Sequence, residues 1–259
     1  MCNIKDIDEL LGREAELAAQ QLGNGLSSIR KYNFAAIGFF YTAIFSVTIG
    51  LERLLKLIIL FDYKKNNQSY PDNNYLKQKG HKLSKLIEEA KSINSTNNYG
   101  VDESVFDDSL SQVIIKFLND FADQSRYYNL DAASGKSLSE NEPLARWDKD
   151  VCVEIIRRHF KVTENKKEMF GALQLLTPAT ISCTHEDGSS IDTLDSYTLS
   201  HIQINDKQRY SMLYIYRIIR FAVKLFRKVE SADLWELFVI YEQKDARALQ
   251  KKVWNPYKR

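Results

Sequence analysis

Glycine, proline and cysteine are scarce in this chain, whose 259 residues include 10 Gly, 4 Pro and 3 Cys. A fold of many short strands needs more Gly and Pro for its turns, so the composition favours helices. Cys2, Cys152 and Cys183 lie far apart and form no CxxC motif. Such spacing is typical of free thiols in a reducing compartment, and the first residues lack the apolar segment of a secretory signal. We therefore expect a cytoplasmic protein.

Several signatures of catalysis and cofactor binding are also missing. The sequence has no Gly-rich phosphate loop, no HExxH motif and no GxSxG motif. Five His and Asp residues lie close together without the spacing of zinc or calcium ligands. They are His185, Asp187, Asp192, Asp195 and His201. The sequence therefore predicts no metal site and no cofactor.

The longest apolar stretch runs from residue 33 to residue 62 and has no charged residue between Phe34 and Leu51. It is open to two interpretations, a helix buried in a bundle or a membrane span, which needs about 18–20 apolar residues. Ser46 and Thr48 dilute the stretch, no second span accompanies it, and no Trp anchors its ends. We expect a buried helix and no membrane partner.

Amphipathic periodicity predicts further helices on both sides of this stretch. The expected helices cover residues 4–23, 28–63, 80–93, 102–126, 143–162, 207–229 and 231–253. Between 170 and 206 the pattern changes: ATISCTH and YTLSHIQI are rich in β-branched residues and flank a turn at Asp187–Gly188, which predicts a hairpin or an irregular insert. The predicted fold is an all-α helical bundle over residues 1–165, a β-leaning or irregular insert over 166–206, and C-terminal helices over 207–259 that complete the same domain.

The predicted helix at 207–229 carries the main candidate for a binding surface. With 100° per residue, its basic residues fall within about a third of the circumference, opposite an apolar side. They are Arg209, Arg217, Arg220, Lys224, Arg227 and Lys228. The net charge is only +2, so this local row is the main electrostatic signal. A row of cations suits a phosphate backbone, and the alternative is an ordinary solvated helix face. The residues expected to contact nucleic acid are Arg217, Arg220, Lys224 and Arg227.

A second candidate is SRYYNLD, residues 125–131, at the end of the predicted fourth helix. Arg126 and Asp131 can pair with each other and fasten the helix end. Alternatively, Arg126 holds a phosphate while Tyr127 and Asn129 orient a ligand. The sequence leaves both interpretations open.

Three charges interrupt the last third of the apolar helix: Glu52, Arg53 and Lys56. Glu52 and Lys56 are spaced i, i+4 and can pair, and inside a bundle they must pair or line a polar pocket. His81 opens the next predicted helix, where it either caps the helix or serves as an acid–base group. We expect Glu52 and Lys56 to face a ligand.

Three segments together resemble the HEPN superfamily, in particular its uncharacterised bacterial branches. They are IGLERLLKL, KGHKLSKLIEEA and FADQSRYYNLD, and the resemblance covers about residues 35–160. It implies an all-α bundle of four or five helices that often forms a homodimer. Many HEPN proteins are metal-independent ribonucleases of toxin–antitoxin or phage-defence systems.

The catalytic motif of that family, an Arg followed four to six residues later by a His, is not found here. Asp131 stands where a His would follow Arg126, and Arg158 directly precedes His159. The leading hypothesis is therefore a non-catalytic or atypical HEPN-like protein that binds RNA, a nucleotide or a protein partner as a homodimer. A second hypothesis is a ribonuclease with Arg126, Asp131 and His81 as its catalytic residues. A third is an immunity or antitoxin protein that blocks a toxin.

Overall fold

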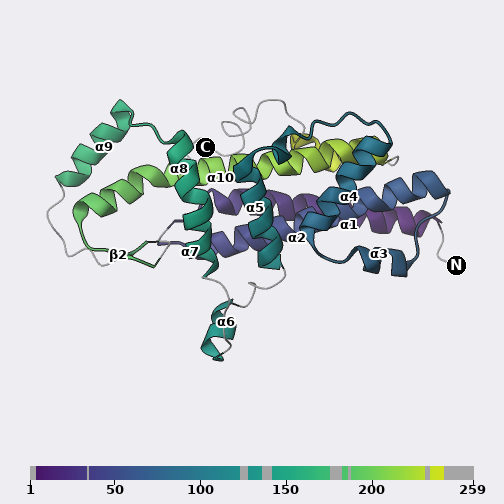
Figure 1. Ribbon diagram of the computed structural model, residues 1–259, viewed down its shortest axis with the longest axis horizontal. Coiled ribbons are helices and arrows are strands. Elements are labelled where there is room, and N and C mark those ends of the chain that lie inside the picture. Colours follow the sequence, from purple (N-terminus) through teal and green to yellow (C-terminus); the bar gives the residue numbers. More distant parts are fainter. Residues whose placement is uncertain are drawn as a thin grey trace.

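Three long helices form the body of the protein in the computed structural model (Figure 1): α1 (Ile4–Ile29), α2 (Gly38–Asn67) and α10 (Leu194–Val229). The structure describes residues 4–33, 35–122, 128–135, 142–175, 183–185, 188–230 and 234–241. The shorter helices are α3 (Asn73–Lys79), α4 (Leu83–Thr96), η1 (Ser104–Phe106), α5 (Ser109–Asp120), α6 (Tyr128–Ala133), α7 (Pro143–Trp147), η3 (Asp148–Cys152), α8 (Val153–His159), α9 (Glu164–Gln174) and η4 (Leu234–Tyr241). The predicted all-α fold is confirmed.

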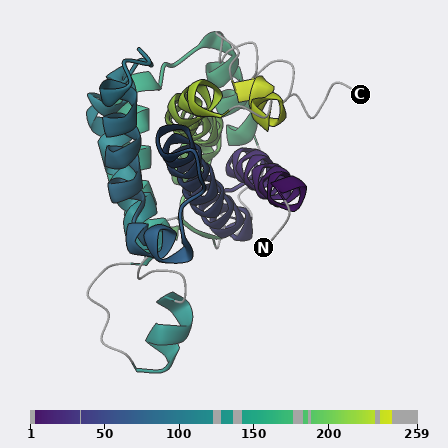
Figure 2. The ribbon, with the colours of Figure 1, turned by 90° about the vertical axis from the view of Figure 1, so that its right-hand side faces the viewer.

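Helix α2 is the centre of the bundle. Seen end-on in Figure 2, it lies between α1, α10 and the layer formed by α4 and α5. Its buried side chains point to several sides and include Leu54, Leu55, Leu57 and Ile59. The long apolar stretch is therefore a buried helix, as expected. Within the described ranges, no helix is long and apolar enough to cross a membrane.

Two glycines let α1 and α2 pack at close range. A Cβ atom added to Gly25 would lie 2.5 Å from Cγ2 of Val47, and one added to Gly50 would lie 2.8 Å from Cγ of Leu22. The prediction that α1 ends at Gly23 is wrong, because the glycines serve this helix contact and the helix continues to Ile29. The next helix begins at Gly38 rather than near residue 28.

Side-chain caps fix where the helices of the second layer begin. The carboxylate of Asp108 accepts the N–H groups of Leu110 and Ser111, so α5 begins at Ser109 after the short turn η1, later than predicted. The predicted helix at 143–162 is confirmed as one run of α7, η3 and α8, which ends at His159 and contains one π-helical turn at η3. Helix α3 lies between the helices predicted at 28–63 and 80–93, where no helix was expected.

The insert contains a small hairpin followed by the start of α10. Strands β1 (Cys183–Thr184) and β2 (Ser190–Ile191) pair antiparallel, with Cys183 opposite Ile191. The β-leaning segment YTLSHIQI, residues 197–204, is helical, so the prediction that helix resumes near residue 207 is wrong. The β-branched residues of this segment resemble a strand, but a side-chain cap starts the helix: the hydroxyl of Thr193 accepts the N–H of Ser196. Thr198 and Ile202 are then buried at helical spacing.

The end of the chain also differs from the prediction. Instead of a helix over 231–253, the described part is the 3₁₀ helix η4, and residues 242–259 lie outside the described ranges. Phe238 of η4 is fully buried, with its ring 5.6 Å from that of Phe226 on α10. This contact holds η4 on the bundle.

Candidate functional site

The C-terminal half of α10 has one apolar side and one basic side. Phe226 packs against Phe61 of α2 with ring centroids 5.8 Å apart, and Phe221 packs against Phe106 of η1 at 4.8 Å. These contacts fix the rotation of α10 about its axis. The basic residues of the predicted row are therefore directed away from the core, with partly or fully exposed side chains: Arg217, Arg220, Lys224, Arg227 and Lys228.

A loop of fixed shape faces this row of cations. It joins α4 to η1, and the buried amide of Asn94 holds it from inside. The Asn94 amide donates to the carbonyl of Val101 at 2.9 Å and to the carboxylate of Glu103 at 2.7 Å, and accepts the N–H of Val101 at 3.0 Å. Asn98 and Gly100 have left-handed φ angles of 53° and 67°. The loop is therefore set by internal bonds that leave its outer edge open to a ligand.

Between the loop and α10 lies a hollow of about 630 Å³. Its lining consists of Tyr99, Gly100, Val101 and Asp102 from the loop and of Arg220, Lys224, Arg227 and Lys228 from the helix. A smaller hollow of about 130 Å³ shares Arg220 and Lys224 with it and adds Arg217. A third, of about 340 Å³, shares Lys228 and adds Lys64 and Lys65 from the end of α2.

The shared lining residues place the three hollows in a row, which we call the basic groove. Its cations are Lys64, Lys65, Arg217, Arg220, Lys224, Arg227 and Lys228, and its carboxylates are Asp102 and Glu230. Seven cations against two carboxylates create a strongly positive local potential on a chain with a net charge of only +2.

Four of these cations have no acidic partner in the part of the chain that the structure describes. Arg217, Arg220, Lys224 and Lys228 form no ion pair with any carboxylate in the described ranges. The buried Nε atom of Arg220 also lacks a hydrogen-bond partner among those residues. Asp102 is near but bonds elsewhere, because its carboxylate accepts the N–H of Ser104 at 2.9 Å. That bond, together with the nearby charges of Lys224 and Arg217, lowers the pKa of Asp102, so it stays ionised at neutral pH.

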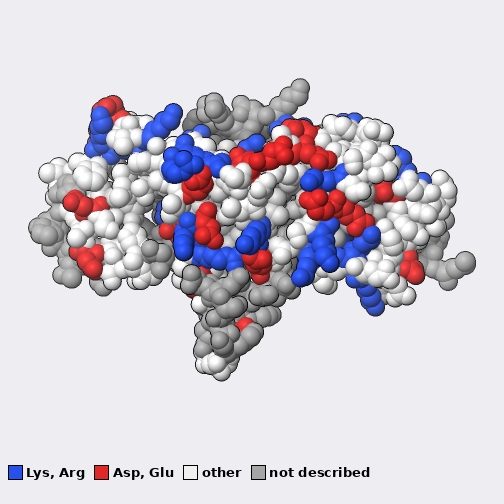
Figure 3. Space-filling model, in the orientation of Figure 1, with Lys and Arg blue, Asp and Glu red and all other residues white. Residues whose placement is uncertain are grey.

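Many cations on other described parts of the surface are paired. Figure 3 shows that Lys and Arg alternate with Asp and Glu on the face that carries α4, α5 and α8. Arg146 bonds to Asp120 at 2.8 Å, and on the arm formed by α9 and the start of α10, Lys166 bonds to Asp206 at 2.5 Å. The groove therefore differs from these paired regions because several cations without an ion pair among the described residues line one concavity.

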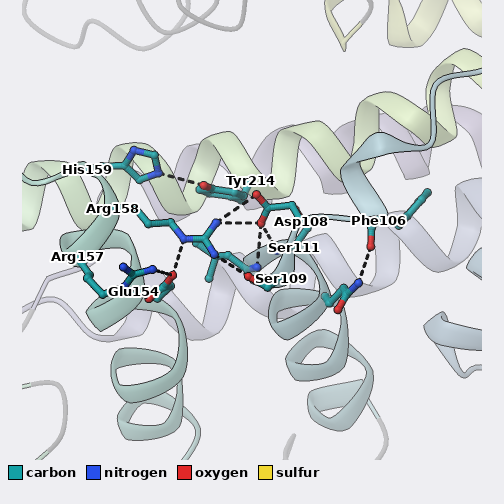
Figure 4. Close-up of polar contacts among 11 residues, drawn as sticks. Phe106, Asp108, Ser109, Ser111, Glu154, Arg157, Arg158, His159 and Tyr214 are labelled. Carbon is teal, nitrogen blue, oxygen red and sulfur yellow. Dashed lines mark hydrogen bonds and ion pairs between the residues drawn. The ribbon is translucent and has the colours of Figure 1, made fainter.

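A contrasting cation is Arg158 of α8 (Figure 4). Its guanidinium donates to Glu154 at 2.5 Å, to both carboxylate oxygens of Asp108 at 3.2 Å and to the hydroxyl of Ser109 at 2.7 Å. These bonds tie α8 to the start of α5, and the bond to Glu154 raises the pKa of Arg158. This guanidinium is already satisfied by carboxylates and has a structural role.

His159 adjoins this cluster and is partly exposed. Its Nε2 lies 3.0 Å from the hydroxyl of Tyr214, and its ring stacks on Tyr210 with centroids 3.8 Å apart. Burial and the adjacent charge of Arg158 lower the pKa of His159, which favours the neutral imidazole. The Tyr214 ring centroid also lies 5.8 Å from the guanidinium carbon of Arg217, so the cluster adjoins the end of the basic groove that Arg217 lines.

The structure brings together three of the residues predicted to form a ligand site. The carboxylate of Glu52 accepts from Lys56 at 2.9 Å and lies 2.7 Å from Nδ1 of His81. Arg53 pairs separately with Glu14 of α1 at 2.6 Å. Glu52 and Lys56 are mostly covered, whereas the His81 side chain is 81% exposed. Their charges are satisfied within the cluster.

The other predicted residues of that site do not join this cluster within the described ranges. Asp131 lies on α6, which stands away from the bundle in both ribbon views (Figures 1 and 2). Arg126 and Tyr127 lie outside the described residues, as does the side chain of Asn129. The convergence of Asp131 with His81 that the ribonuclease hypothesis requires is therefore not seen among the described residues.

Sequence reasoning missed the second wall of the groove. The first part of this wall, Tyr99, Gly100 and Asp102, lies at the junction between the helices predicted at 80–93 and 102–126. The second part, Lys64 and Lys65, directly follows the helix predicted at 28–63. The only local signals were the turn-forming sequence NNYG and the adjacent lysines at the end of the apolar helix. Neither signal says that the two segments meet α10.

The described residues also contain no group of three or more His, Cys, Asp and Glu side chains placed to hold a metal ion. No protein-family model, curated protein or solved structure matches this chain.

Proposed function

We propose that this protein binds nucleic acid, RNA in the first place, by holding its phosphate backbone in the basic groove. The observation that carries the proposal is a row of cations on α10 that faces a preformed loop and forms no ion pair among the described residues: Arg217, Arg220, Lys224 and Lys228. Unpartnered cations gain most from a polyanion, because a bound phosphate chain releases its counterions and no internal salt bridge has to break. The resemblance to HEPN proteins adds the expectation of a homodimer in a bacterial defence or toxin–antitoxin system.

A purely solvated helix face is the competing interpretation, and the arrangement of the groove disfavours it. A solvated face needs no opposite wall, whereas here the loop held by Asn94 encloses a hollow against Lys224 and Lys228. Lys65 extends the cations beyond the end of α10 onto a different helix. Cations from separate segments that meet in one concavity are typical of an anion site.

The ribonuclease alternative draws less support from the described residues. Arg158 and His159 are adjacent to the groove, but both are engaged in the network of Figure 4. Glu52 and His81 pair with each other, and Asp131 lies on the separate helix α6. Among the described residues, the exposed His81 and the partly exposed His159 each already contact a side-chain partner, which gives this alternative less support than the binding proposal.

The test compares the RNA affinity of two double variants, each with two lysines replaced by glutamate. Fluorescence anisotropy at low salt measures the affinity. Lys224→Glu/Lys228→Glu alters the groove. The control, Lys85→Glu/Lys116→Glu, alters two exposed lysines of α4 and α5 that form no ion pair among the described residues. We expect the groove variant to lose affinity by roughly 30-fold or more and the control to lose less than about threefold.

Equal losses in both variants would mean that binding follows bulk charge, and no binding by the wild type would reject the proposal. The same samples, incubated with RNA in the presence of a chelator, show whether strands are cut. Metal-independent cleavage that disappears in Arg126→Ala would replace the binding proposal with the ribonuclease alternative.

A further inference from the structure

The two walls of the basic groove have different chemistry. The α10 wall supplies cations, whereas the loop wall supplies an aromatic ring, that of Tyr99. The Tyr99 ring packs partly against the core, and its hydroxyl accepts a hydrogen bond from Lys65 at 2.9 Å. The ammonium of Lys65 lies 4.9 Å from the ring centroid. The ring is thus held in place on a wall that faces a row of phosphate-binding groups.

The geometry points to a single nucleic-acid strand as the ligand of the basic groove, with its phosphates on α10 and one base stacked on Tyr99. The inference rests on the proposed function and names the substrate class of that site. Successive bases stack on aromatic side chains in proteins that bind single strands, while a positive groove follows the backbone. In a duplex the bases are stacked and paired between two backbones, so a fixed ring at the wall finds no free base face.

The length of the groove favours a strand over a single nucleotide. Arg217 and Lys228 are eleven residues apart on α10, which corresponds to about 16 Å along the helix axis. The third hollow continues from Lys228 to Lys65 on α2. The largest hollow alone, about 630 Å³, has the size of a small-molecule site, typically about 300–1,000 Å³. The whole row suits a strand of roughly four to six nucleotides.

The site is formed before a ligand arrives. Asn94 fixes the loop at both the N–H and the carbonyl of Val101. Gly100 takes the left-handed conformation that the turn requires. On the other side, ring contacts of Phe221 and Phe226 fix α10. Preformed walls reduce the ordering cost of binding, which favours recognition of a flexible strand.

The test measures the binding of fluorescein-labelled ligands to the full chain. The ligands are a single-stranded 8-mer RNA, the same sequence in a duplex, and inorganic polyphosphate and a mononucleotide as competitors. The variants are Tyr99→Leu, Tyr99→Phe and, as a control, Tyr63→Leu, which removes a ring that packs against Tyr75 of α3. Circular dichroism shows whether each variant folds. On the wild type alone, 2-aminopurine placed at successive positions of the 8-mer reports base stacking.

We expect Tyr99→Leu to weaken single-strand binding about tenfold, and Tyr99→Phe and Tyr63→Leu to leave it within about twofold. Polyphosphate binding should not respond to Tyr99→Leu, and the duplex should bind about tenfold more weakly than the single strand. In the wild type, 2-aminopurine fluorescence should fall at one position or two adjacent positions.

The inference is overturned if Tyr99→Leu binds the strand like the wild type, if duplex and strand bind equally, or if no 2-aminopurine position is quenched. It is also overturned if the mononucleotide competes as strongly as the 8-mer, because a nucleotide pocket would then suffice. In each of these cases, binding that still depends on Lys224 and Lys228 would leave the proposed function standing. Absence of any oligonucleotide binding would reject both.

Discussion

Arg158 and Arg220 are two arginines with opposite surroundings on neighbouring parts of one surface. Arg158 is bound by Glu154, Asp108 and Ser109, whereas Arg220 has no carboxylate partner among the described residues and faces a hollow. The comparison shows that the partners of a cationic side chain indicate its role better than its residue type does. A cation that is satisfied internally holds helices together, and one that is left unsatisfied at a concavity is available to an anionic ligand.

The largest effect on RNA binding is expected from the charge reversal Lys224→Glu/Lys228→Glu. Replacing Arg158 or Arg220 with Ala then tests the contrast between a paired and an unpaired arginine. Arg158→Ala leaves Asp108 and Glu154 without their shared donor, in a position where the Arg158 side chain is 22% exposed. We expect a loss of about 2 kcal/mol in the free energy of unfolding, measured by urea denaturation, and little change in RNA affinity.

Arg220→Ala should show the reverse pattern. It removes no ion pair among the described residues, so we expect the unfolding free energy to fall by less than about 1 kcal/mol. RNA affinity should fall about fivefold, because one phosphate contact is lost. If Arg158→Ala weakened binding more than Arg220→Ala did, the division between structural and ligand-facing cations would be wrong.

The salt dependence of binding counts the cations that take part. A single strand held by four to seven cations should give a plot of log affinity against log salt with a slope of about −3 to −5. Arg217→Gln/Lys224→Gln should reduce the steepness by about 1.4, since each lost phosphate contact contributes about 0.7. The matched variant Lys85→Gln/Lys116→Gln should keep the wild-type slope. An unchanged slope in the groove variant would place the phosphates elsewhere.

Removal of the carboxylate inside the groove should strengthen binding. Asp102 is ionised and close to Lys224 and Arg217, so it repels a phosphate chain. Asp102→Asn keeps an acceptor for the N–H of Ser104 and removes the charge. We expect RNA affinity to rise about threefold at low salt and the gain to shrink as salt screens the repulsion. A loss of affinity would instead mean that Asp102 accepts a hydrogen bond from the ligand.

The smallest effect concerns the pH dependence of the paired region. The pKa of His159 is lowered in the folded protein by burial and by Arg158, which outweigh the opposite influence of Asp206 and Asp108. The unfolded chain therefore takes up a proton near its ordinary pKa of about 6.5 while the folded protein resists it. Stability is full above that pH and declines as the pH falls through the lowered folded pKa.

We expect the melting temperature to fall between pH 7.5 and pH 5.5, and the fall to be smaller in His159→Gln. Part of the pH dependence should remain in this variant, because burial also lowers the pKa of His201. A thermal scan at several pH values checks this. An identical pH dependence in His159→Gln and the wild type would contradict the lowered pKa of His159.

The periodic features of the sequence were sufficient to predict the elements that carry the groove. The apolar stretch that forms α2 and the two-sided pattern that places Arg217, Arg220 and Lys224 on one face of α10 are local signals. Helix ends were harder to predict where a residue serves a distant contact. Gly25 looks like a helix terminator, but its missing Cβ makes room for Val47 of α2.

The opposite wall could not be predicted from spacing. Tyr99 and Lys65 are 34 residues apart in the chain, and each reaches the groove only because α4, α2 and α10 pack together. The left-handed conformation of Asn98 and the bonds made by Asn94 depend on the folded loop rather than on any motif. Similarly, the sequence indicated Glu52 and His81 as separate candidates and predicted no direct pairing, whereas the structure shows their contact at 2.7 Å.

The most direct test of the central claim is lysine footprinting of the wild-type protein. The free protein and the protein saturated with single-stranded RNA are treated briefly with an acetylating reagent, and modification of each lysine is read by mass spectrometry. We predict strong protection of Lys224 and Lys228, weaker protection of Lys65, and unchanged reactivity at the exposed residues Lys85 and Lys116. Unchanged reactivity at Lys224 and Lys228 in the saturated complex would contradict the account.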